Sequence, residues 1–367
     1  MVYRAIGLMS GSSLDGLDIA FVEFRENAGS WSYEVKAADC LPYDNEWIER
    51  LTYAPSMKAS DYHLLHVNYG HYIGQLVNGF IEKNSFQYQV QLIASHGHTT
   101  FHMPSGRMTA QLGDGASIAA TTGINVVSDL RAMDIALGGQ GAPIVPIGEK
   151  LLFSEYDFFL NLGGIANISC NDPSKYIAFD ICPANRVLNM LAAGAGKLFD
   201  ENGEMAAKGT IQPELLHILN TLEYYRQPWP RSLSNDFGTQ LVYPLIKNAA
   251  YQLSDSLCTY VEHICVQVNS SIQGLLADSA SSTSGHRLLI TGGGAHNSFL
   301  IERLKSHLQP LSVNVHIPAK ELVDFKEAII MALIGVLRWR EENNVLATVT
   351  GATRNSIGGA VWMGQEA

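Results

Sequence analysis

Residues 4–18 read R-A-I-G-L-M-S-G-S-S-L-D-G-L-D and lead into the alternating stretch I-A-F-V-E-F at residues 19–24. Short apolar runs before and after the glycine–serine segment are typical of a β-hairpin with a tight turn. In such a turn the main-chain N–H groups and the serine hydroxyls can donate hydrogen bonds to an anion. An ordinary hairpin accounts for the same residues, so this stretch alone leaves both interpretations open.

The turn also carries two carboxylates, Asp15 and Asp18, either of which could hold a divalent cation through water. A Walker phosphate loop is excluded, because the segment lacks G-x-x-x-x-G-K-[S/T] and leads into a strand rather than a helix. If the turn binds phosphate, it does so through the main-chain N–H groups and hydroxyls of a β-hairpin.

The composition limits the class of protein. With 367 residues, of which 47% are hydrophobic, the chain can bury a large core, and its length favours two domains. The formal net charge of −11 argues against a nucleic-acid partner or an anionic membrane surface. Five cysteines without a C-x-x-C pair favour a reducing compartment. The sequence shows no signal segment and no apolar run long enough to span a membrane, so we expect a soluble cytoplasmic protein.

Strand ends in the first half carry polar side chains. Residues 90–94 are predicted as a buried strand that delivers S-H-G-H-T, residues 95–99, at its carboxyl end, where α/β sheets usually place ligand chemistry. A further strand at residues 124–127 has Arg131 at its polar exit. Both segments are candidates for a ligand site.

Residues 158–169, F-F-L-N-L-G-G-I-A-N-I-S, repeat the opening pattern of strand, glycine turn and strand. A hairpin at the start of each half suggests two related domains that face one another across a cleft. The glycine- and proline-rich residues 135–146 mark the boundary. We expect a first domain of residues 1–135 with 345–367, and a second domain of residues 136–344.

Asp180 follows the next predicted strand, residues 176–179, and precedes Pro183 and a helix predicted over residues 184–192. A carboxylate at a strand end, near a helix N-terminus and the second glycine turn, is well placed to act as a base. Capping of the helix explains the position slightly better, so both interpretations stay open here.

The rest of the second half adds two candidate features. Three glycines at residues 292–294 lie between a strand at residues 287–290 and a helix, so a flat ligand or a diphosphate could rest against the main chain. A helix predicted over residues 326–340 carries Glu327 in its first turn, where a carboxylate favours the helix dipole whatever else it does. One or two long helices are expected over residues 238–275.

Together and in chain order, the motifs resemble those of the anhydro-N-acetylmuramic acid kinase family. They read G-L-M-S-G-S-S-L-D-G-L-D (7–18), S-H-G-H-T (95–99), Q-L-G-D (111–114), G-I-N-V-V-S-D-L-R (123–131), G-G-Q-G-A-P-I-V-P (138–146), N-L-G-G-I-A-N-I-S (161–169), F-D-I-C-P-A-N (179–185), T-G-G-G-A-H-N (291–297), E-A-I-I-M-A-L (327–333) and V-T-G-A (349–352). The resemblance implies the two-domain α/β fold of actin, hexokinase and Hsp70, which is ribonuclease H-like, with nucleotide in the interdomain cleft.

Enzymes of this family use ATP and water to open the 1,6-anhydro bridge of anhydro-N-acetylmuramic acid, a cell-wall recycling sugar, and they form the 6-phosphate and ADP. The resemblance implies that Asp180 is the base toward water, that ATP and Mg²⁺ are cofactors, that a small anhydrosugar is the substrate, and that the chain forms a homodimer. The residues implied to bind the nucleotide and magnesium are Gly11, Ser12, Ser13, Leu14, Asp15, Gly16, Leu17, Asp18, Gly163, Gly164, Asn167, Gly292, Gly293, Gly294, His296 and Asn297, with Asp15 and Asp18 nearest the metal. Those implied near the sugar are His98, Thr99, Arg131, Asn185 and Glu327.

Several positions depart from the family pattern. Ser12 replaces a threonine, His98 replaces a glutamine, Ile181, Cys182 and Ala184 replace the usual small residues after the base, and residues 232–236 lack an arginine. These departures leave Asp180 and the nucleotide loops intact and bear on sugar recognition.

Two other functions remain open: a kinase of the same fold for another anhydrosugar, such as levoglucosan, and a non-catalytic, chaperone-like nucleotide-binding protein. Arg131 suits the lactyl carboxylate of anhydro-N-acetylmuramic acid and favours the first function. A metal site at His96, His98 and His102, and a reactive thiol at Cys182, are weaker alternatives to plain hydrogen bonding and core packing.

Overall fold

The computed structural model describes residues 1–11, 14–172, 176–229, 231–278 and 285–364. The chain divides into two compact units, Met1–Phe153 with Phe325–Ala367 (unit 1) and Ser154–Asp324 (unit 2). Residues 136–153 and 325–344, which the sequence analysis placed in the second domain, therefore belong to unit 1. The physical reason is packing within unit 1: a Cβ on Gly148 would lie 2.5 Å from the Ile330 side chain.

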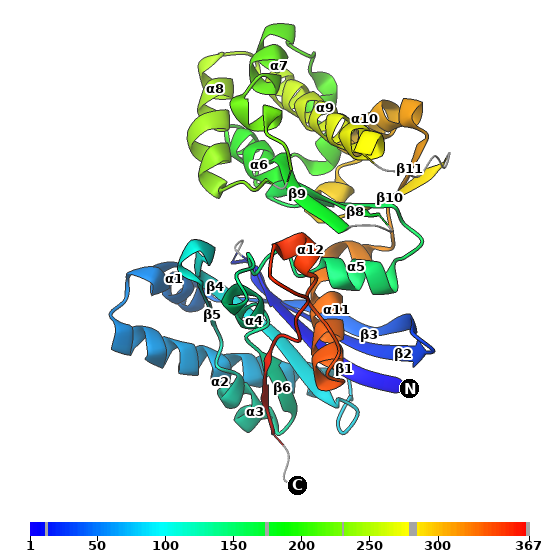
Figure 1. Ribbon diagram of the computed structural model, residues 1–367. Helices are drawn as coiled ribbons and strands as arrows, with labels where there is room; N and C mark the ends of the chain where they lie inside the picture. Colours follow the sequence, from blue (N-terminus) through cyan, green and yellow to red (C-terminus); the bar gives the residue numbers. More distant parts are fainter. Residues whose placement is uncertain (12–13, 173–175, 230, 279–284, 365–367) are drawn as a thin grey trace. The chain divides into compact units, whose positions relative to one another are not determined.

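Unit 1 is built on a mixed sheet (Figure 1) with the strand order β12-β6-β4-β1-β2-β3, and β5 pairs with β4. Its strands are β1 (Val2–Ser10), β2 (Gly16–Asn27), β3 (Ser30–Pro42), β4 (Leu92–Met103), β5 (Met108–Leu112), β6 (Asn125–Ser128) and β12 (Ala360–Trp362). Strands β1, β2 and β3 form an antiparallel meander, β4 runs parallel to β1, and β6 runs parallel to β4. The hairpin expected from residues 4–24 is found.

The two faces of the β1 strand are covered in different ways because its side chains alternate. Ile6 and Leu8 are fully buried in a core cluster that includes residues of α2 (Ala59–Lys83), such as Ile73. Gly7 points to the other face, where a Cβ would come within 1.9 Å of the Ala328 carbonyl of α11 (Lys320–Trp339). The other helices of unit 1 are α1 (Asn45–Tyr53), α3 (Gly115–Thr122), α4 (Ala132–Ala136), α5 (Pro146–Leu152) and α12 (Ala347–Thr350).

The α11 helix corrects one prediction from the sequence. It begins at Lys320 rather than near residue 326, so Glu327 lies beyond the first turn. The dipole of a helix acts mainly on charges within its first and last turns. A helix-dipole role therefore does not explain Glu327.

Unit 2 contains a five-stranded sheet of order β11-β10-β7-β8-β9. The strands are β7 (Phe158–Leu162), β8 (Ile165–Asn171), β9 (Tyr176–Pro183), β10 (His286–Thr291) and β11 (Val313–His316). As in unit 1, three antiparallel strands are followed by two strands parallel to the first. The β3-β2-β1-β4-β6 order of unit 1 is thus repeated as β9-β8-β7-β10-β11, which is the internal repeat expected from the two glycine hairpins.

The helices of unit 2 are α6 (Asn185–Ala193), α7 (Pro213–Asn220), α8 (Tyr243–Asn248), α9 (Leu253–Asp278) and α10 (Ser298–Leu308). Strand residues such as Leu160 and Ile290 share one buried cluster with Val261 and Ile264 of α9. The helical stretch expected over residues 238–275 is broken into a π-helical turn (Phe237–Val242), α8 and α9, with Ala250 in the left-handed region at φ 54°.

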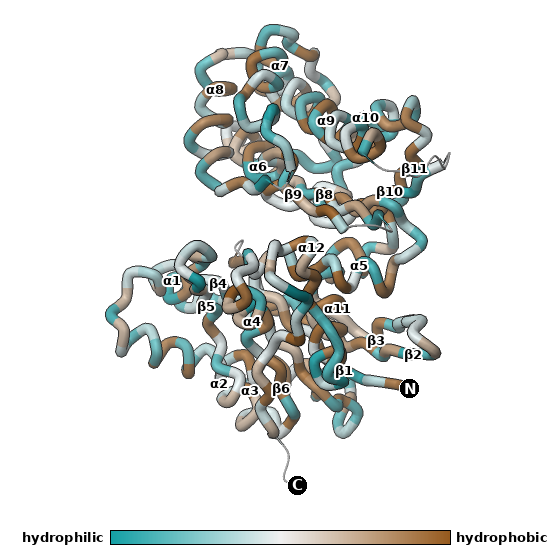
Figure 2. The backbone as a smooth tube through the Cα atoms, in the orientation of Figure 1, coloured by the Kyte–Doolittle hydropathy of each residue, from teal (hydrophilic) through white to brown (hydrophobic). Residues whose placement is uncertain are grey.

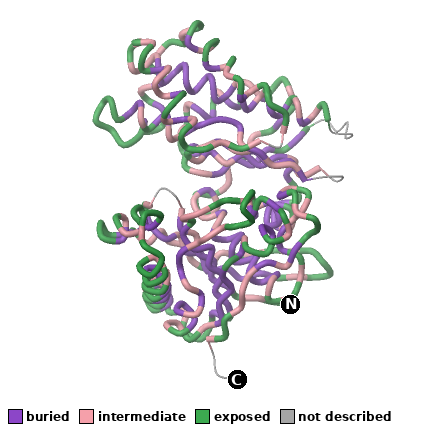
Figure 3. The backbone as a smooth tube through the Cα atoms, turned by 60° about the vertical axis from the view of Figure 1, so that its left-hand side comes forward, coloured by how far each residue is buried: buried purple, intermediate pink, exposed green. Residues whose placement is uncertain are grey.

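Apolar and buried residues concentrate in the strands of each sheet and in the helix faces packed on them, as the hydropathy and burial colouring show (Figures 2 and 3). Within the described residues, none of the helices combines the length and apolar character that a membrane crossing requires.

Candidate active site

The first glycine hairpin of unit 1 joins β1 to β2, with Ser10 paired to Leu17. Gly16 is required by packing, because a Cβ there would lie 2.6 Å from the Leu41 carbonyl of β3. Leu17 is 1% exposed and belongs to the core, so only its main chain is available to a ligand. Leu14 adopts a left-handed conformation at φ 59°, and the predicted residues Ser12 and Ser13 lie outside the described residues.

The two carboxylates of this hairpin are arranged differently. Asp15 is exposed, whereas Asp18 is half-buried beside the Cys40 thiol. Burial, and then the negative charge of Asp18, raise the pKa of Cys40 to about 12. In the described part of the chain, no three His, Cys, Asp or Glu side chains gather as a metal-binding group. Two carboxylates suit a cation such as Mg²⁺, which keeps several waters and takes substrate phosphates as ligands.

A cavity of about 200 Å³ in unit 1 brings together three of the predicted sugar-binding residues. It is lined by Met9, Ser10, Gly11, His96, His98, Thr99 and Arg131. These residues come from the end of β1, from β4 and from the segment after β6. Residues 95–99, which lie within β4 rather than after its end, and Arg131, each a candidate ligand segment from the sequence, thus contribute to the same cavity in unit 1.

A β-bulge in β4 sets which side chains reach this cavity. Leu8 pairs with Ser95, but Ser10 pairs with His98, so two residues of β4 lie opposite Met9. Gly97 makes the bulge possible with φ 72°, and a Cβ there would lie 2.5 Å from the Leu112 carbonyl. The extra residue brings His98 rather than Gly97 beside Ser10.

Arg131 is held at the cavity by neutral partners. Its Nε donates to Nε2 of His96 at 2.8 Å, and its Nη1 donates to the Gly141 carbonyl at 2.6 Å. Burial lowers the pKa of the guanidinium to about 10, with Glu327 and Asp134 opposing that shift by their charge. Among the described residues no carboxylate lies within ion-pair distance of Arg131. A positive group with remaining N–H donors thus lines the cavity, as the binding of a carboxylate requires.

The hydrogen bonds of His96 fix its tautomer. Because Nε2 accepts from Arg131, the ring proton is on Nδ1, which donates to the Gly97 carbonyl at 2.8 Å. Burial, with the nearby charge of Arg131 as the second cause, lowers the pKa of His96 to about 3. Both nitrogens are occupied, so the histidine metal site considered for residues 96–102 is not formed by His96.

The second glycine hairpin, in unit 2, is hydrogen-bonded to the start of α6 through the carbonyl groups of the hairpin glycines. The N–H groups of Ala184 and Asn185 donate to Gly164 and Gly163 at 2.8 and 3.0 Å. The N–H groups of Gly163 and Gly164 take no acceptor in the described chain. A Cβ on either glycine would find its nearest neighbour at 3.4 Å or beyond. Packing within the protein therefore does not demand glycine here, whereas close approach of a ligand to the main chain would.

The glycine triplet lies next to this hairpin. A Cβ on Gly292, which has φ 82°, would lie 2.5 Å from the Asn161 side chain, and one on Gly294 would lie 2.7 Å from Leu162. Asn185 donates its side-chain amide to the Leu162 carbonyl at 2.8 Å. Asn185, predicted near the sugar, therefore bonds to the residue before the glycine hairpin of unit 2, and its side chain lies beside the triplet, since a Cβ on Gly294 would be 3.0 Å from it.

Two residues predicted for the nucleotide have other partners. His296 contacts Asp324, with Nε2 2.8 Å from Oδ1. Asn297 caps α10, because its side-chain oxygen accepts the Leu300 N–H at 3.0 Å. The main chain at these two positions still belongs to the glycine loop. The two side chains, however, make hydrogen bonds within the protein.

Asp180 is fixed by three hydrogen bonds. Its N–H donates to the Arg231 carbonyl at 3.1 Å, its carbonyl accepts the Tyr224 hydroxyl at 2.7 Å, and its Oδ2 accepts the Leu233 N–H at 2.8 Å. Burial raises the pKa of Asp180 and outweighs the opposing effect of the Leu233 N–H. In the described residues no group donates to Oδ1. One carboxylate oxygen is thus anchored and the other is left for a ligand or water.

The helix-capping interpretation of Asp180 is wrong, because α6 begins without a side-chain cap and the carboxylate bonds to Leu233 instead. Asn167, predicted for the nucleotide, is paired with Asp180 across β8 and β9. Cys182 is fully buried, and burial raises the pKa of its thiol above the usual range. A thiol in that state is a core group and not a nucleophile.

Several residues of the site were missed by the sequence analysis. They are Asn161, which pairs with Asn167 beside Asp180, Tyr224 and Leu233, which hold Asp180, and Tyr43 and Tyr69, which contact Ser10. The alternation of β7 could have pointed to Asn161. The others reach the site through contacts across 33 or more residues of sequence, which local pattern does not reveal.

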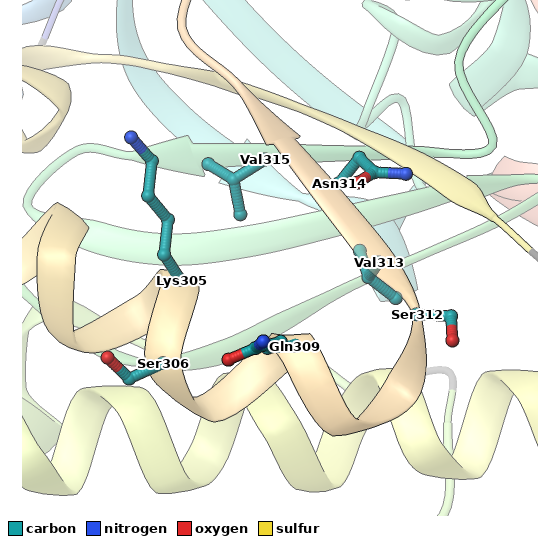
Figure 4. Close-up of a pocket in the computed structure, with 7 residues that line it drawn as sticks. All are labelled: Lys305, Ser306, Gln309, Ser312, Val313, Asn314 and Val315. Atoms are coloured by element: carbon teal, nitrogen blue, oxygen red, sulfur yellow. The ribbon is translucent and has the colours of Figure 1, made fainter.

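A hollow larger than the unit 1 cavity lies in unit 2. About 390 Å³ in volume, it lies between the end of α10 and β11 and is lined by Lys305, Ser306, Gln309, Ser312, Val313, Asn314 and Val315 (Figure 4). None of the predicted site residues lines it, and Lys305 is its single charged group. It is a surface groove without the convergent chemistry of the unit 1 cavity.

The repeated sheet, with a glycine hairpin opening each unit and a glycine triplet after β10, defines the actin, hexokinase and Hsp70-like class of ATP-using proteins. Within that class the chain belongs to the anhydro-N-acetylmuramic acid kinase family, whose family model matches residues 3–364. It is therefore an enzyme, a kinase that uses ATP and a small sugar.

Curated relatives agree over nearly the whole chain. Proteins named anhydro-N-acetylmuramic acid kinase from Coxiella burnetii and Aliivibrio fischeri are each 33% identical, covering 99% and 98% of this chain and 98% and 99% of their own. One from Haemophilus influenzae is 32% identical over 97% of both chains. Among solved structures, an activator of the 2-hydroxyisocaproyl-CoA dehydratase from Clostridium difficile with bound ADPNP aligns with a TM-score of 0.46 and 12% identity, covering 92% of this chain and 96% of its own.

The depressed pKa of His96 predicts a pH-dependent stability of unit 1. An unfolded histidine binds a proton near pH 6.5, whereas folded His96 does so near pH 3, so its contribution is complete above pH 6.5 and is lost as the pH falls toward 3. Between pH 7.5 and pH 5 the wild type should lose about 2 kcal/mol more unfolding free energy than His96→Gln.

Urea unfolding followed by tryptophan fluorescence would measure this difference. Four of the five tryptophans lie in unit 1, so a Trp229→Phe background confines the signal to that unit. Parallel pH profiles for wild type and His96→Gln would contradict a neutral, buried His96.

Proposed function

We propose that this enzyme uses ATP and water to open the 1,6-anhydro bridge of anhydro-N-acetylmuramic acid and to phosphorylate O6, forming N-acetylmuramic acid 6-phosphate and ADP. The observation that carries the proposal is the state of Asp180: a partly buried carboxylate with one oxygen anchored by the Leu233 N–H and the other without a donor among the described residues. A carboxylate whose pKa is raised by burial is a stronger base toward water.

The reaction balances with this single carboxylate. Water attacks the anomeric carbon and gives a proton to Asp180, while the bond between the anomeric carbon and O6 breaks. O6 takes the γ-phosphoryl group as the bond between that phosphorus and the β,γ-bridging oxygen of ATP breaks. A glycosidase needs an acid to protonate its leaving oxygen, whereas here the phosphoryl group captures that oxygen.

Each glycine hairpin is proposed to bind phosphate oxygens of ATP through its main chain. The support is strongest in unit 2, where Gly163 and Gly164 use their carbonyls on α6 and keep their N–H groups for an anion. Gly292, Gly293 and Gly294 would lie against the adenosine. Asp15 and Asp18 would hold Mg²⁺, which when bound neutralises charge on the phosphates.

The unit 1 cavity is proposed to bind the sugar. Arg131 would pair with the lactyl carboxylate, because it is a partly buried cation without an ion-pair partner among the described residues. His98 and Thr99 would contact neighbouring oxygens, and Glu327, whose charge acts on Arg131, would lie close by. Cytoplasmic location agrees with the use of ATP and with five cysteines that are all free thiols. We propose a homodimer from the resemblance to the family alone.

Replacement of the base tests the reaction directly. Asp180→Asn should lower sugar-dependent ADP release by about 10²–10⁴-fold, the usual contribution of a general base, while ATP binding measured by calorimetry stays within twofold. Mass spectrometry of the product should show the gain of both phosphate and water. Unchanged turnover in Asp180→Asn would remove Asp180 from the mechanism.

The hydrogen bond from Leu233 predicts a shift in the pH profile. Its N–H stabilises the ionised carboxylate, so Leu233→Pro, which deletes that donor, should raise the pKa of Asp180 further and move the acid limb of kcat/KM to higher pH. Leu233→Ala keeps the N–H and serves as the matched control. Identical acid limbs for the two variants would mean that the limb belongs to another group.

A variant of Arg131 distinguishes the two candidate anhydrosugar substrates. Loss of a charge-assisted hydrogen bond costs about 1.5–3 kcal/mol, so Arg131→Met should raise KM for anhydro-N-acetylmuramic acid by about 10–150-fold. Activity toward levoglucosan, which has no carboxylate, should change far less. The exposed Arg107→Met is the control in the same unit. If the wild-type enzyme prefers levoglucosan, the alternative function, a kinase for another anhydrosugar, would be favoured.

A further inference from the structure

Arg186 is a cation of unit 2 to which the sequence analysis gave no role. It is the second residue of α6 and directly follows Asn185. Its side chain lies along the second glycine hairpin, because a Cβ on Gly164 would be 3.8 Å from both the Cβ and the Nε of Arg186. Arg186 as a whole is partly exposed, but its Nε is buried. A charged donor is thus held against the hairpin.

Nothing in the described part of the chain satisfies this guanidinium. Its Nε has no hydrogen-bond partner, and no described carboxylate lies within ion-pair distance of it. A buried donor without an acceptor destabilises a protein, and a charged donor does so more strongly. The position is unfavourable for a second reason, because a positive charge in the first turn of a helix opposes the helix dipole. An anion bound beside Arg186 would remove both costs.

The free main-chain donors at this place belong to the hairpin and not to α6. The N–H groups of residues 184–186 all donate to carbonyls of the hairpin glycines, at 2.8–3.3 Å. The N–H groups of Gly163 and Gly164 take no acceptor in the described chain. Main-chain N–H groups of a glycine turn and the planar fork of an arginine are both typical ligands of phosphate oxygens. The chemistry beside Arg186 therefore suits a phosphate.

A comparison with Arg231 shows that the unpaired nitrogen of Arg186 is unusual. The Nε of Arg231 is also buried without a partner. However, its Nη1 donates to the Gln227 carbonyl at 2.9 Å, and its guanidinium lies 5.0 Å from the centre of the Tyr224 ring. Arg231 is therefore held by the protein itself. The Arg186 guanidinium has no hydrogen bond, ion pair or aromatic ring contact among the described residues.

Asp180 is not the anion that Arg186 serves, although β9, which carries Asp180, leads into α6. Burial raises the pKa of Asp180 and the Leu233 N–H lowers it, and the charge of Arg186 is not among the causes of that shift. A guanidinium close enough to form an ion pair would lower the pKa of the carboxyl group. Arg186 is therefore available to a ligand and leaves the proposed base without a counter-ion.

We propose that Arg186 is a phosphate-binding residue that acts with the N–H groups of Gly163 and Gly164 on the polyphosphate of ATP. The chain has a formal net charge of −11, and none of the residues assigned above to the nucleotide is an arginine or a lysine. Arg186 supplies the missing positive charge next to the hairpin. The inference rests on the proposed use of this hairpin for phosphate and not on the identity of the sugar.

Nucleotide affinity measured without sugar tests the role of Arg186. Calorimetric titration of Arg186→Met with adenosine, AMP, ADP and ATP, in the presence of Mg²⁺, should show a loss of affinity that begins at a phosphorylated ligand. The expected loss is about 10–150-fold, as for one charge-assisted hydrogen bond. Adenosine should bind to the wild type and to the variant equally. Urea unfolding checks that the variant is folded.

Two further variants sharpen this experiment. Arg186→Lys keeps the charge but loses the planar fork, so it should recover part of the affinity for ATP. Arg287→Met is the matched control, because it removes an exposed arginine from the opposite end of β10 to the glycine triplet. It should bind all four ligands as the wild type does.

Three results would overturn the proposal. Equal affinities of wild type and Arg186→Met for all four ligands would exclude a phosphate contact. An equal loss for adenosine and ATP would show that Arg186 only supports the loops. A wild type that binds no nucleotide would count against the use of ATP, and this inference would fall with it. Because the titrations contain no sugar, failure of the anhydrosugar reaction would not change their outcome.

Discussion

The contact between β1 and α11 at Gly7 is the constraint on which unit 1 depends. A Cβ on Gly7 would lie 1.9 Å from the Ala328 carbonyl, so the helix can approach the strand only because the side chain is absent. The residue before Ala328 is Glu327, whose charge acts on Arg131, and the one before that is Lys326, which forms a buried ion pair with Glu149 of α5 at 2.8 Å. Removal of one partner from a buried ion pair strongly destabilises the folded protein, because the other charge is left buried and unpaired. The same close packing therefore sets the helix, ties α5 to it and places the carboxylate of the candidate site.

Arg131 and Asp180 lie in different units but are supported in the same way. The guanidinium is held by a neutral imidazole and a carbonyl, and the carboxylate by a main-chain N–H. An opposite charge within the protein would have neutralised either group and lowered its affinity for a charged ligand or its basicity. Neutral hydrogen-bond partners fix geometry and leave the charge unsatisfied. This arrangement suits an arginine that binds an anionic group and an aspartate that accepts a proton.

The sequence predicted the elements that local pattern determines: both hairpins, the strands that carry residues 95–99 and 180, and the glycine triplet before a helix. It was wrong about where those two strands end, because β4 continues to Met103 and β9 to Pro183. It missed the start of α11 because residues 320–325 carry no capping signal distinct from the helix interior, and it missed the break near Ala250 because a left-handed alanine has no sequence signature. The partners of Asp180 and Ser10 were also missed. Leu233 reaches Asp180 across 53 residues, and His98 reaches Ser10 across 88 residues, so only the folded chain brings them together.

The internal repeat shows why similar glycine turns need not have similar causes. In unit 1, Gly16 is dictated by the β3 strand, since a side chain would collide with Leu41 and Cys40. In unit 2, Gly163 and Gly164 have room for a Cβ, and yet both positions lack one. Packing leaves space at these two positions, and their main-chain N–H groups have no acceptor in the described part of the chain. The absence of a side chain is therefore best explained by something outside the chain that comes close to the backbone. The glycines that the fold does not require are therefore the more informative ones about the ligand, and they lie beside Asn167 and Asp180.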